Sequence, residues 1–454
     1  MASPPPPAFA LAALPTSSAP SSAFFAPPLT TSRPTSRPHS ATRHTIRAVH
    51  PPNKAPPPAS STASKAIAAF AAASILLSAP SLPPAAHAPF VAPPFVAPAH
   101  AARGAKGGGA SFLSASGDVN KDPESLLRWS LPISNKPVRE LQTELEAAVT
   151  DLRGLKWAKV DNHVKAASRL LNNQTNKILV AVPAAARDDA SAVLASAADR
   201  LHDVEAAVTD KSTDKLTKAC KDVLGDIGRV EEMMVAKFPF QVPDEFSNLP
   251  QLKGRATVEM LVKKDGDEPF DIEGTIFKEG KMTLVLDGYS APISAGSFVD
   301  LVNKGFYNDN PVFRSDGFII QAGKPKNGEG FTDATGKVRS IPLEIFARGD
   351  KEPTYGITLE EDGRGAQGTV LPFTSYGTLA MARAETEANT ASSQFFWFLF
   401  EPDLTPAGRN LMDGNWAVFG YTTKGENFLK GLQKGDRIVE AKVVDGLQNL
   451  VTAK

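Results

Sequence analysis

The chain has 454 residues with 49 basic and 49 acidic side chains, so its formal net charge is zero. This length exceeds the usual size of one hydrophobic core, and we expect two folded units with additional segments. The zero charge hides an asymmetry, because residues 1–117 contain Lys and Arg but no Asp or Glu. The rest of the chain is therefore acidic, which argues against nucleic acid as a partner.

Cysteine and histidine are scarce in the body of the chain. Cys220 is the only cysteine, so no intramolecular disulfide can form. From Pro239 onward there is neither Cys nor His. This excludes Cys/His nucleophiles and Cys/His metal sites from the C-terminal half, and we expect neither a metal nor a cofactor there.

Two targeting signals stand in series at the N-terminus. Residues 1–60 are rich in Pro, Ser, Thr and Ala with scattered Arg, a composition typical of a transit peptide. Lys65 then precedes a short apolar run at 66–77, and Ala86-His87-Ala88 supplies a small-x-small cleavage site. The run is too short to span a bilayer as a helix. We therefore interpret residues 61–101 as a second, Sec-like signal.

This tandem arrangement resembles the bipartite targeting of proteins to the chloroplast thylakoid lumen. It predicts a chloroplast transit peptide over 1–60, a lumenal signal over 61–101 and a mature form with no integral membrane span. Two alternatives remain: a disordered arm with a chance apolar stretch, and a single transit peptide to the stroma. Small-x-small sites at 97–99 and 99–101 leave the mature N-terminus open.

Residues 102–120 are predicted to be a linker, and residues 121–238 a four-helix-type bundle. Apolar residues recur at helical spacing in four stretches, 138–152, 157–179, 190–208 and 216–234. Asn135 before Pro137 marks the first helix start, and Gly154 its end. Cys220 lies within the fourth stripe, which favours a packed small hydrophobe over a redox role. The bundle is either structural, or it docks a partner or covers a neighbouring site.

A Pro-rich connector at 239–254 ends the helical pattern, and residues 255–454 show many short strand patterns. One helix is expected over 294–304. Strands are expected at 257–262, 274–277, 282–286, 318–321, 378–381, 395–400, 416–420 and 438–444. The predicted fold class is multidomain α + β, with the bundle followed by a closed antiparallel β-barrel with flanking helices.

Six segments of this half stand in an order that resembles the cyclophilin family of peptidyl-prolyl cis-trans isomerases. They begin at Ala291 (APISAGSF), Gly305 (GFY), Arg314 (RSDGFIIQ), Gly377 (GTLAMA), Ser393 (SQFF) and Met412 (MDGNWAVFG). The resemblance covers roughly residues 255–450. Together with the tandem signal and the bundle, it is closest to the multidomain thylakoid-lumen cyclophilins of plants.

The resemblance implies a chemistry that needs no nucleophile. Rotation about a peptide bond has a barrier of about 18–20 kcal/mol. A fixed hydrogen-bond donor lowers it by stabilising the twisted amide, whose nitrogen gains a lone pair. Arg314 is the one permanently charged donor in the matched motif, and the family's catalytic arginine occupies this place.

The same resemblance implies the substrate-binding residues. Phe318, Ile319, Phe396 and Leu411 would line the pocket for the proline ring, and the amides of Gln321 and Gln394 would hold the substrate backbone. Ala382 and Arg383 would contact the residue before proline, and Trp416 completes the predicted groove. Taken alone, the 395–400 stretch reads more simply as a buried strand.

The sequence also departs from the family pattern. One residue fewer separates Arg314 from Gly317-Phe318 than is common, and a displacement of the guanidinium by about 1 Å would cost on the order of 100-fold in rate. Leu411 stands where many members have Trp, and Arg383 where Asn is common. The 324–370 connection is longer than usual and ends near an acidic run at 360–362, which predicts a solvated loop or a partner-docking loop.

The leading hypothesis is a lumenal peptidyl-prolyl isomerase that assists folding, assembly or maintenance of photosynthetic membrane complexes. Its expected partners are proline-containing peptide segments of client proteins, in particular lumenal regions of those complexes. The alternative is a catalytically weak or inactive cyclophilin that acts as a chaperone, scaffold or regulatory binding protein, with the bundle covering the groove.

Overall fold

The computed structural model describes residues 119–452, apart from residues 334, 400–409 and 411. The targeting segments predicted over 1–60 and 61–101 lie outside the described residues, and so does nearly all of the predicted linker. Within the described ranges, none of the helices combines the length and apolar character needed to cross a bilayer.

The first described helix, α2, spans Pro123–Ser130 and was not anticipated from the sequence. Its start follows from local chemistry, because the Asp122 side chain accepts a hydrogen bond from the Glu124 N–H at 3.0 Å and Pro123 occupies the first helical position. A helix of 8 residues has only about two turns, so its apolar residues show too little periodicity to be recognised.

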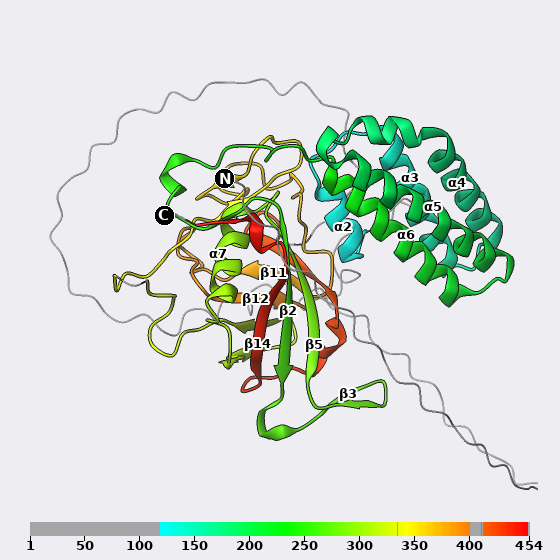
Figure 1. Ribbon diagram of the computed structural model, residues 1–454. Helices are drawn as coiled ribbons and strands as arrows, with labels where there is room; N and C mark the ends of the chain where they lie inside the picture. Colours follow the sequence, from blue (N-terminus) through cyan, green and yellow to red (C-terminus); the bar gives the residue numbers. More distant parts are fainter. Residues whose placement is uncertain (1–118, 334, 400–409, 411, 453–454) are drawn as a thin grey trace, which may run out of the picture. The chain divides into compact units, whose positions relative to one another are not determined.

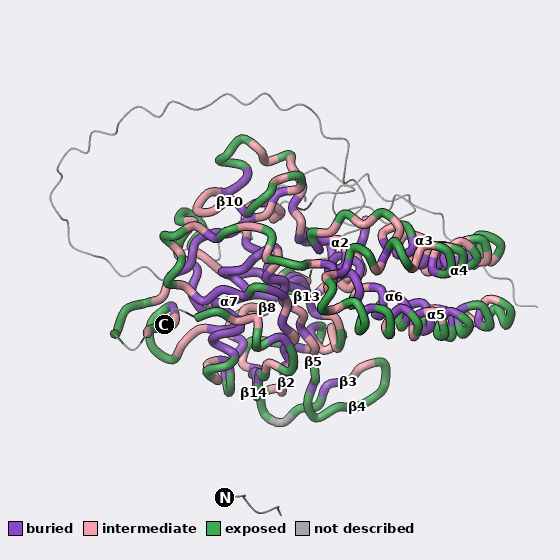
Figure 2. The backbone as a smooth tube through the Cα atoms, turned by 45° about the horizontal axis from the view of Figure 1, so that its top comes forward, coloured by how far each residue is buried: buried purple, intermediate pink, exposed green. Residues whose placement is uncertain are grey.

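Four longer helices follow and confirm the predicted helical region. They are α3 Lys136–Arg153, α4 Trp157–Val180, α5 Arg187–Thr209 and α6 Thr213–Met233. Asn135 caps α3 by accepting a hydrogen bond from the Val138 N–H at 3.0 Å, and Gly154 follows the last residue of that helix. Figure 2 shows the buried residues gathered where these helices face one another. Each helix contributes one apolar stripe to a single core.

The C-terminal half is mostly β-structure with one long helix (Figure 1). Its elements are β1 Gln251–Leu252, β2 Arg255–Lys263, β3 Phe270–Ile272, β4 Thr275–Phe277, β5 Gly280–Asp287, α7 Pro292–Asn303, β6 Asn310–Pro311, β7 Arg314–Ser315, β8 Ile319–Ala322, β9 Glu344–Ile345, β10 Thr354–Tyr355, β11 Thr378–Met381, β12 Phe395–Phe398, β13 Val418–Lys424, β14 Arg437–Asp445 and β15 Leu450–Val451.

Nine of these strands form one antiparallel sheet in the order β6-β14-β2-β5-β13-β11-β12-β8-β7. Its two edge strands belong to one segment, because β7 follows β6 directly in the chain. Between them the Val312 N–H donates to the Asp436 carbonyl at one edge, and the Phe313 N–H donates to the Gln321 carbonyl at the other. A sheet whose edges meet in this way has to curl. The predicted fold is confirmed as a curled antiparallel sheet with helices.

Strand β2 shows how the sheet separates its two faces, since its residues alternate between buried and half-buried along its whole length. The inward residues form a core into which α7 packs. Phe298 of α7 lies at its centre, with its ring centroid 4.8 Å from that of Tyr307, 4.9 Å from Phe395 and 5.1 Å from Phe419. These contacts fix α7 against β12 and β13.

The 324–370 connection corrects part of an expectation. It was predicted to be a solvated or partner-docking loop; most of 326–340 is exposed, but the stretch 341–345 is buried. Strands β9 and β10 pair within it, and Leu343, Ile345, Ala347 and Leu359 form a small core with Ala417. The acidic run at 360–362 is exposed. The connection therefore has its own packing and fixes the segment that precedes β13.

Candidate active site

A single row of directly paired residues crosses five neighbouring strands. Arg314 of β7 is paired with Gln321 of β8, Gln321 with Phe396 of β12, Phe396 with Ala380 of β11, and Ala380 with Val418 of β13. Residues directly opposite one another on antiparallel strands point to the same face. We call these five residues the cross-strand row. It brings the predicted donor, one predicted amide and the predicted pocket floor to one face of the sheet.

The strand spacing sets the scale of this arrangement. Neighbouring strands lie about 4.8 Å apart, so the backbones at Arg314 and Phe396 are roughly 10 Å apart, with Gln321 between them. A peptide lying across the row can therefore reach a cationic donor and an apolar floor together. The alternation along β12 supports this placement, because Phe395 and Trp397 belong to the inner core while Phe396 and Phe398 lie on the other face.

The guanidinium of Arg314 is held by a carboxylate two residues away. Its Nε–H and an Nη2–H donate to Asp316 Oδ2, at 2.8 Å and 2.6 Å. The other oxygen, Oδ1, accepts the backbone N–H groups of Phe318 and Ile319, both at 3.0 Å. The Arg314 side chain is 18% exposed. One carboxylate therefore joins the predicted catalytic donor to the turn that carries two predicted pocket residues.

A tight turn joins β7 and β8, in the segment where the sequence has one residue fewer than the common pattern. Gly317 has a φ of +83°, a conformation that glycine adopts without strain. A Cβ at this position would meet nothing within 4 Å, so the backbone conformation, rather than crowding, requires glycine. The Ser315 hydroxyl donates to the Leu432 carbonyl at 3.0 Å and fixes β7 from its other side. The shortened segment is thus a tight, well-anchored turn.

The two predicted amides lie in contact. Gln321 Nε2 donates to Gln394 Oε1 at 3.0 Å, and Gln394 Nε2 donates to the Glu329 backbone carbonyl at 2.7 Å. Lys324 Nζ lies 2.8 Å from the Glu329 carboxylate. Glu329 was not identified from the sequence, because nothing in its surroundings distinguishes it from a solvated loop residue. With both Gln394 contacts in place, Gln321 keeps its Oε1 as an acceptor for a ligand N–H.

The apolar part of the site gathers around Phe396, which is only 3% exposed. Half-buried Ile319, Ala382, Met412 and Trp416 belong to the same cluster, which we call the pocket cluster. Trp416 meets the Phe396 ring edge-on, with centroids 5.7 Å apart and an interplanar angle of 87°. The pocket floor is therefore covered by the protein's own side chains in this structure.

Three further points concern the predicted pocket residues. Phe318 is 39% exposed and lies at the rim, with its carbonyl accepting from the Leu399 N–H at 2.8 Å. Leu411 lies outside the described residues. Met412 was missed by the sequence analysis, although it begins one of the matched segments. Its position beside Phe396 becomes evident only when the strands are assembled.

Arg383 lies over Trp416 rather than free in the groove. Its guanidinium carbon is 4.8 Å from the ring centroid. Its N–H groups donate to the backbone carbonyls of Asn415 at 2.9 Å, Ala384 at 2.8 Å and Glu385 at 2.9 Å. Burial lowers the pKa of Arg383, and the nearby Glu361 and Glu385 oppose that effect. The guanidinium is thus held by the indole and by three backbone carbonyls, at the place where a contact to substrate is predicted.

The segment that carries Met412 and Trp416 is held in place by hydrogen bonds to two other parts of the chain. Asp413 Oδ1 accepts the Phe373 N–H at 2.8 Å, and burial raises the pKa of this carboxyl to about 6. The Leu359 N–H donates to the Gly414 carbonyl at 2.9 Å. Leu359 belongs to the long 324–370 connection, so that connection takes part in positioning the segment that carries Met412 and Trp416.

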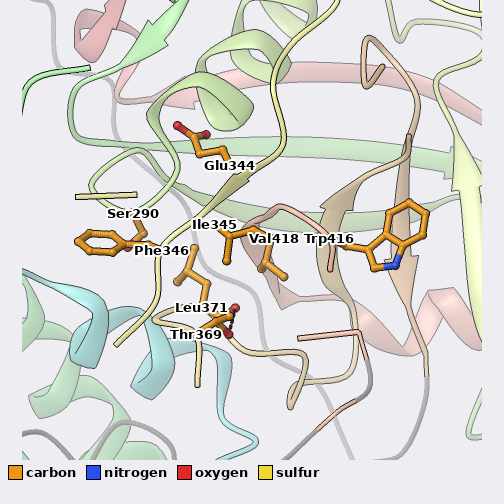
Figure 3. A pocket seen from close by; sticks show the side chains of 8 residues that line it. All are labelled: Ser290, Glu344, Ile345, Phe346, Thr369, Leu371, Trp416 and Val418. Carbon is orange, nitrogen blue, oxygen red and sulfur yellow. Dashed lines mark hydrogen bonds between the residues drawn. The ribbon is translucent and has the colours of Figure 1, made fainter. Parts of the chain in front are cut away.

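A small cavity lies between β9, residues 369–371 and the start of β13 (Figure 3), with room for about one water molecule. Glu344 points away from the other lining side chains, and its carboxylate accepts the Ile293 and Ser294 N–H groups of α7 at 3.1 Å and 2.8 Å. Burial raises the pKa of Glu344 to about 7, and the two N–H groups act in the opposite direction. Among the described residues, no group of His, Cys, Asp and Glu is arranged to hold a metal ion.

Two family models match the chain. The model described as cyclophilin type peptidyl-prolyl cis-trans isomerase/CLD matches residues 270–448. The model described as the PsbQ-like domain of CYP38-like peptidyl-prolyl cis-trans isomerases matches residues 122–235. The two matches fall on the β-sheet half and on the helical half respectively.

Three relatives are similar over most of their own length. A Synechocystis protein named as a candidate thylakoid lumen peptidyl-prolyl cis-trans isomerase, sll0408, is 45% identical over 74% of this chain and 86% of its own. The chloroplastic peptidyl-prolyl cis-trans isomerase CYP38 of Arabidopsis thaliana is 44% identical over 74% of this chain and 76% of its own. The chloroplastic CYP37 of the same plant is 30% identical over 75% and 73%.

Proposed function

Because the chain belongs to the cyclophilin-type peptidyl-prolyl cis-trans isomerases, we propose that it catalyses the cis-trans isomerisation of Xaa-Pro bonds in client proteins of the chloroplast thylakoid lumen. The observation that carries the proposal is the cross-strand row, which places Arg314, Gln321 and Phe396 on one face. Relatives named for the thylakoid lumen and the chloroplast support the location.

Each residue has a defined role in this proposal. Arg314 donates a hydrogen bond to the prolyl nitrogen as the amide twists, because a permanently charged donor stabilises the lone pair that appears there. Gln321 and Gln394 hold the substrate backbone. The proline ring enters beside Phe396, against the half-buried Ile319 of the pocket cluster, whose remaining apolar surface it would bury.

The remaining predicted contacts form the walls and rim of the groove. Ala382 and Arg383 contact the residue before proline, Trp416 closes one side and Phe318 lies at the rim. Leu411 is proposed from the sequence resemblance alone. The reaction breaks no covalent bond, so it needs positioned donors and an apolar pocket but no nucleophile.

The clients that we propose are proline-containing lumenal segments of photosynthetic membrane complexes, whose folding, assembly or maintenance the protein would assist. Support comes from the lumenal names of the relatives and from the acidic body of the chain, which does not favour nucleic acid.

The test is isomerase activity of the full chain on a short Xaa-Pro peptide, with the wild type compared with Arg314→Ala. We expect at least a roughly 100-fold loss of kcat/KM in the variant, typical of removing one electrostatic donor. Arg437→Ala is the matched control, because Arg437 lies on the same sheet, is exposed and pairs with Asp309 at 3.0 Å. Equal activity of wild type and Arg314→Ala, with folding verified by circular dichroism, would refute the proposal.

A second function is favoured by two observations. Phe396 is only 3% exposed and Arg314 is already paired with Asp316. Both facts fit a protein that binds proline-containing segments with little turnover, as a chaperone or scaffold. Peptide binding measured by calorimetry separates the two functions. Under the second, Arg314→Ala binds peptide as wild type does and neither protein shows turnover.

A further inference from the structure

The carboxylate of Asp316 lies in the β7–β8 turn, and each of its two oxygens accepts hydrogen bonds from a different part of the chain. Oδ2 takes two N–H groups from Arg314, and Oδ1 takes the backbone N–H groups of Phe318 and Ile319. The Asp316 side chain is 34% exposed and that of Arg314 is 18% exposed. Among the described residues, no other side chain forms a hydrogen bond or ion pair with the Arg314 guanidinium.

The Arg314–Asp316 contact leaves some of the guanidinium N–H groups available to a ligand. A guanidinium carries five N–H groups in a fixed plane. Asp316 takes the Nε–H and one Nη2–H, so the two Nη1–H groups and the second Nη2–H remain. Because the plane is rigid, fixing the Nε edge on Asp316 also fixes where the remaining donors point.

We propose that Asp316 is the positioning residue for Arg314, a role that rests on the isomerase function proposed above. It holds the guanidinium and the turn with Phe318 and Ile319 as one unit, so that donor and pocket rim keep a fixed separation. The tight turn makes this contact available, since Gly317 at a φ of +83° returns the chain so that Asp316 faces both neighbours. The shortened segment therefore keeps Arg314 in place through a carboxylate within the same turn.

The variant that isolates this role is Asp316→Asn. An asparagine keeps one carbonyl oxygen for the N–H groups of Phe318 and Ile319, but its NH₂ cannot accept from Arg314. Asp316→Ala removes both sets of contacts and reports on the turn as well. The matched control is Asp309→Asn, which removes an exposed carboxylate from the residue before β6 and leaves the turn intact.

We expect the Asp316→Asn full chain to unfold at the wild-type denaturant midpoint and to lose roughly 10- to 100-fold in kcat/KM, as a displacement of about 1 Å would cause. The loss is expected in kcat, with KM little changed, because the apolar pocket is untouched. In ¹⁵N NMR, the Arg314 Nε–H resonance should exchange slowly with water in the wild type and rapidly in Asp316→Asn. The Asp309→Asn control should match the wild type in all three readouts.

The outcomes separate the two proposals. If Arg314→Ala is inactive while Asp316→Asn retains wild-type kcat/KM, the positioning role is wrong and the isomerase function stands. If Arg314→Ala is as active as the wild type, both fail together. A gain of activity in Asp316→Asn would also contradict the positioning role, because Asp316 would then restrain Arg314 instead of aiming it.

Discussion

Arg383 stacks on the indole of Trp416, with its guanidinium carbon 4.8 Å from the ring centroid, and Trp416 in turn meets Phe396 edge-on. A stacked Arg–Trp pair contributes on the order of 0.5–1 kcal/mol at exposed sites. The Arg383 fork also binds the Asn415 carbonyl, so the residue before the tryptophan is fixed by the same side chain. Arg383, Trp416 and Phe396 therefore form one packed unit at the cross-strand row.

Replacing Trp416 by Ala is expected to weaken peptide binding more than catalysis. Under the proposed function, the indole would supply apolar surface to the bound peptide in both ground state and transition state, so KM should rise several-fold while kcat changes less. Steady-state kinetics on an Xaa-Pro peptide measures both constants.

A suitable control for this variant is Phe277→Ala, which removes a partly exposed ring from the β3–β4 hairpin, away from the cross-strand row. A loss in kcat as large as that of Arg314→Ala, with unchanged KM, would show that Trp416 acts on the reaction itself and not as a wall.

The bundle offers a prediction about stability. Leu145 lies at the centre of α3 with no exposed surface, and Leu145→Ala should cost about 2–5 kcal/mol of unfolding free energy through lost burial and a residual cavity. Leu155, next to the end of the same helix, is 60% exposed, so Leu155→Ala should change stability by less than about 0.5 kcal/mol. Urea unfolding followed by circular dichroism at 222 nm measures both. Similar midpoints for the two variants would be inconsistent with a packed bundle core.

The sequence predicted the four long helices because each carries an apolar stripe over many turns, as in α6 from Leu216 to Val230. The same argument fails for α2, whose eight residues hold too few turns. Each expected strand has a counterpart, but the short strands β1, β3, β6, β7, β9, β10 and β15 were not predicted, and neither was the pairing. No local sequence feature predicts that Gln321 pairs with Phe396, because the register depends on how strands distant in the sequence assemble.

Contacts within the site were harder to predict than its residue types. Asp316 and Glu329 read as ordinary solvated carboxylates, and their roles appear only when the turn and the Gln321–Gln394 contact exist in space. Glu344 shows most clearly that the environment of a residue could not be predicted from the sequence. A glutamate in a long polar connection predicts exposure, yet it is 1% exposed because the N-terminus of α7 supplies two N–H donors that make its burial tolerable.

Cys220 gives a prediction about reactivity. It has no exposed surface within the bundle core, and burial raises the pKa of its thiol to about 12. Because the thiolate is the reactive form, native protein should resist an aromatic disulfide reagent at mildly alkaline pH and react fully once unfolded in urea. Absorbance of the released thiolate follows the reaction. Rapid labelling under native conditions would place Cys220 in contact with solvent and contradict the bundle packing.

Glu344 gives a prediction about pH, with a sign that follows from its burial. Desolvation raises the pKa of this carboxyl from 4.5 to about 7 in the folded protein. Between those values the unfolded chain has lost the proton while the folded protein keeps it, so the folded state loses relative stability as pH rises. The stabilisation of the folded state by the protonated Glu344 carboxyl is fully present below pH 4.5. It falls by about 3 kcal/mol as the pH approaches 7 and then levels off.

The measurement is urea unfolding of wild type and Glu344→Gln across this pH range. Burial also raises the pKa of Glu231 to about 7 and of Asp413 to about 6, but both groups are present in each protein and cancel in the difference. Wild type should therefore lose stability relative to Glu344→Gln as pH rises from 4.5 toward 7. Glu140→Gln, at an exposed site on α3, should leave the pH profile unchanged. If the difference in unfolding free energy between wild type and Glu344→Gln stays constant across this pH range, then the two α7 N–H groups, rather than desolvation, determine the pKa of the Glu344 carboxyl.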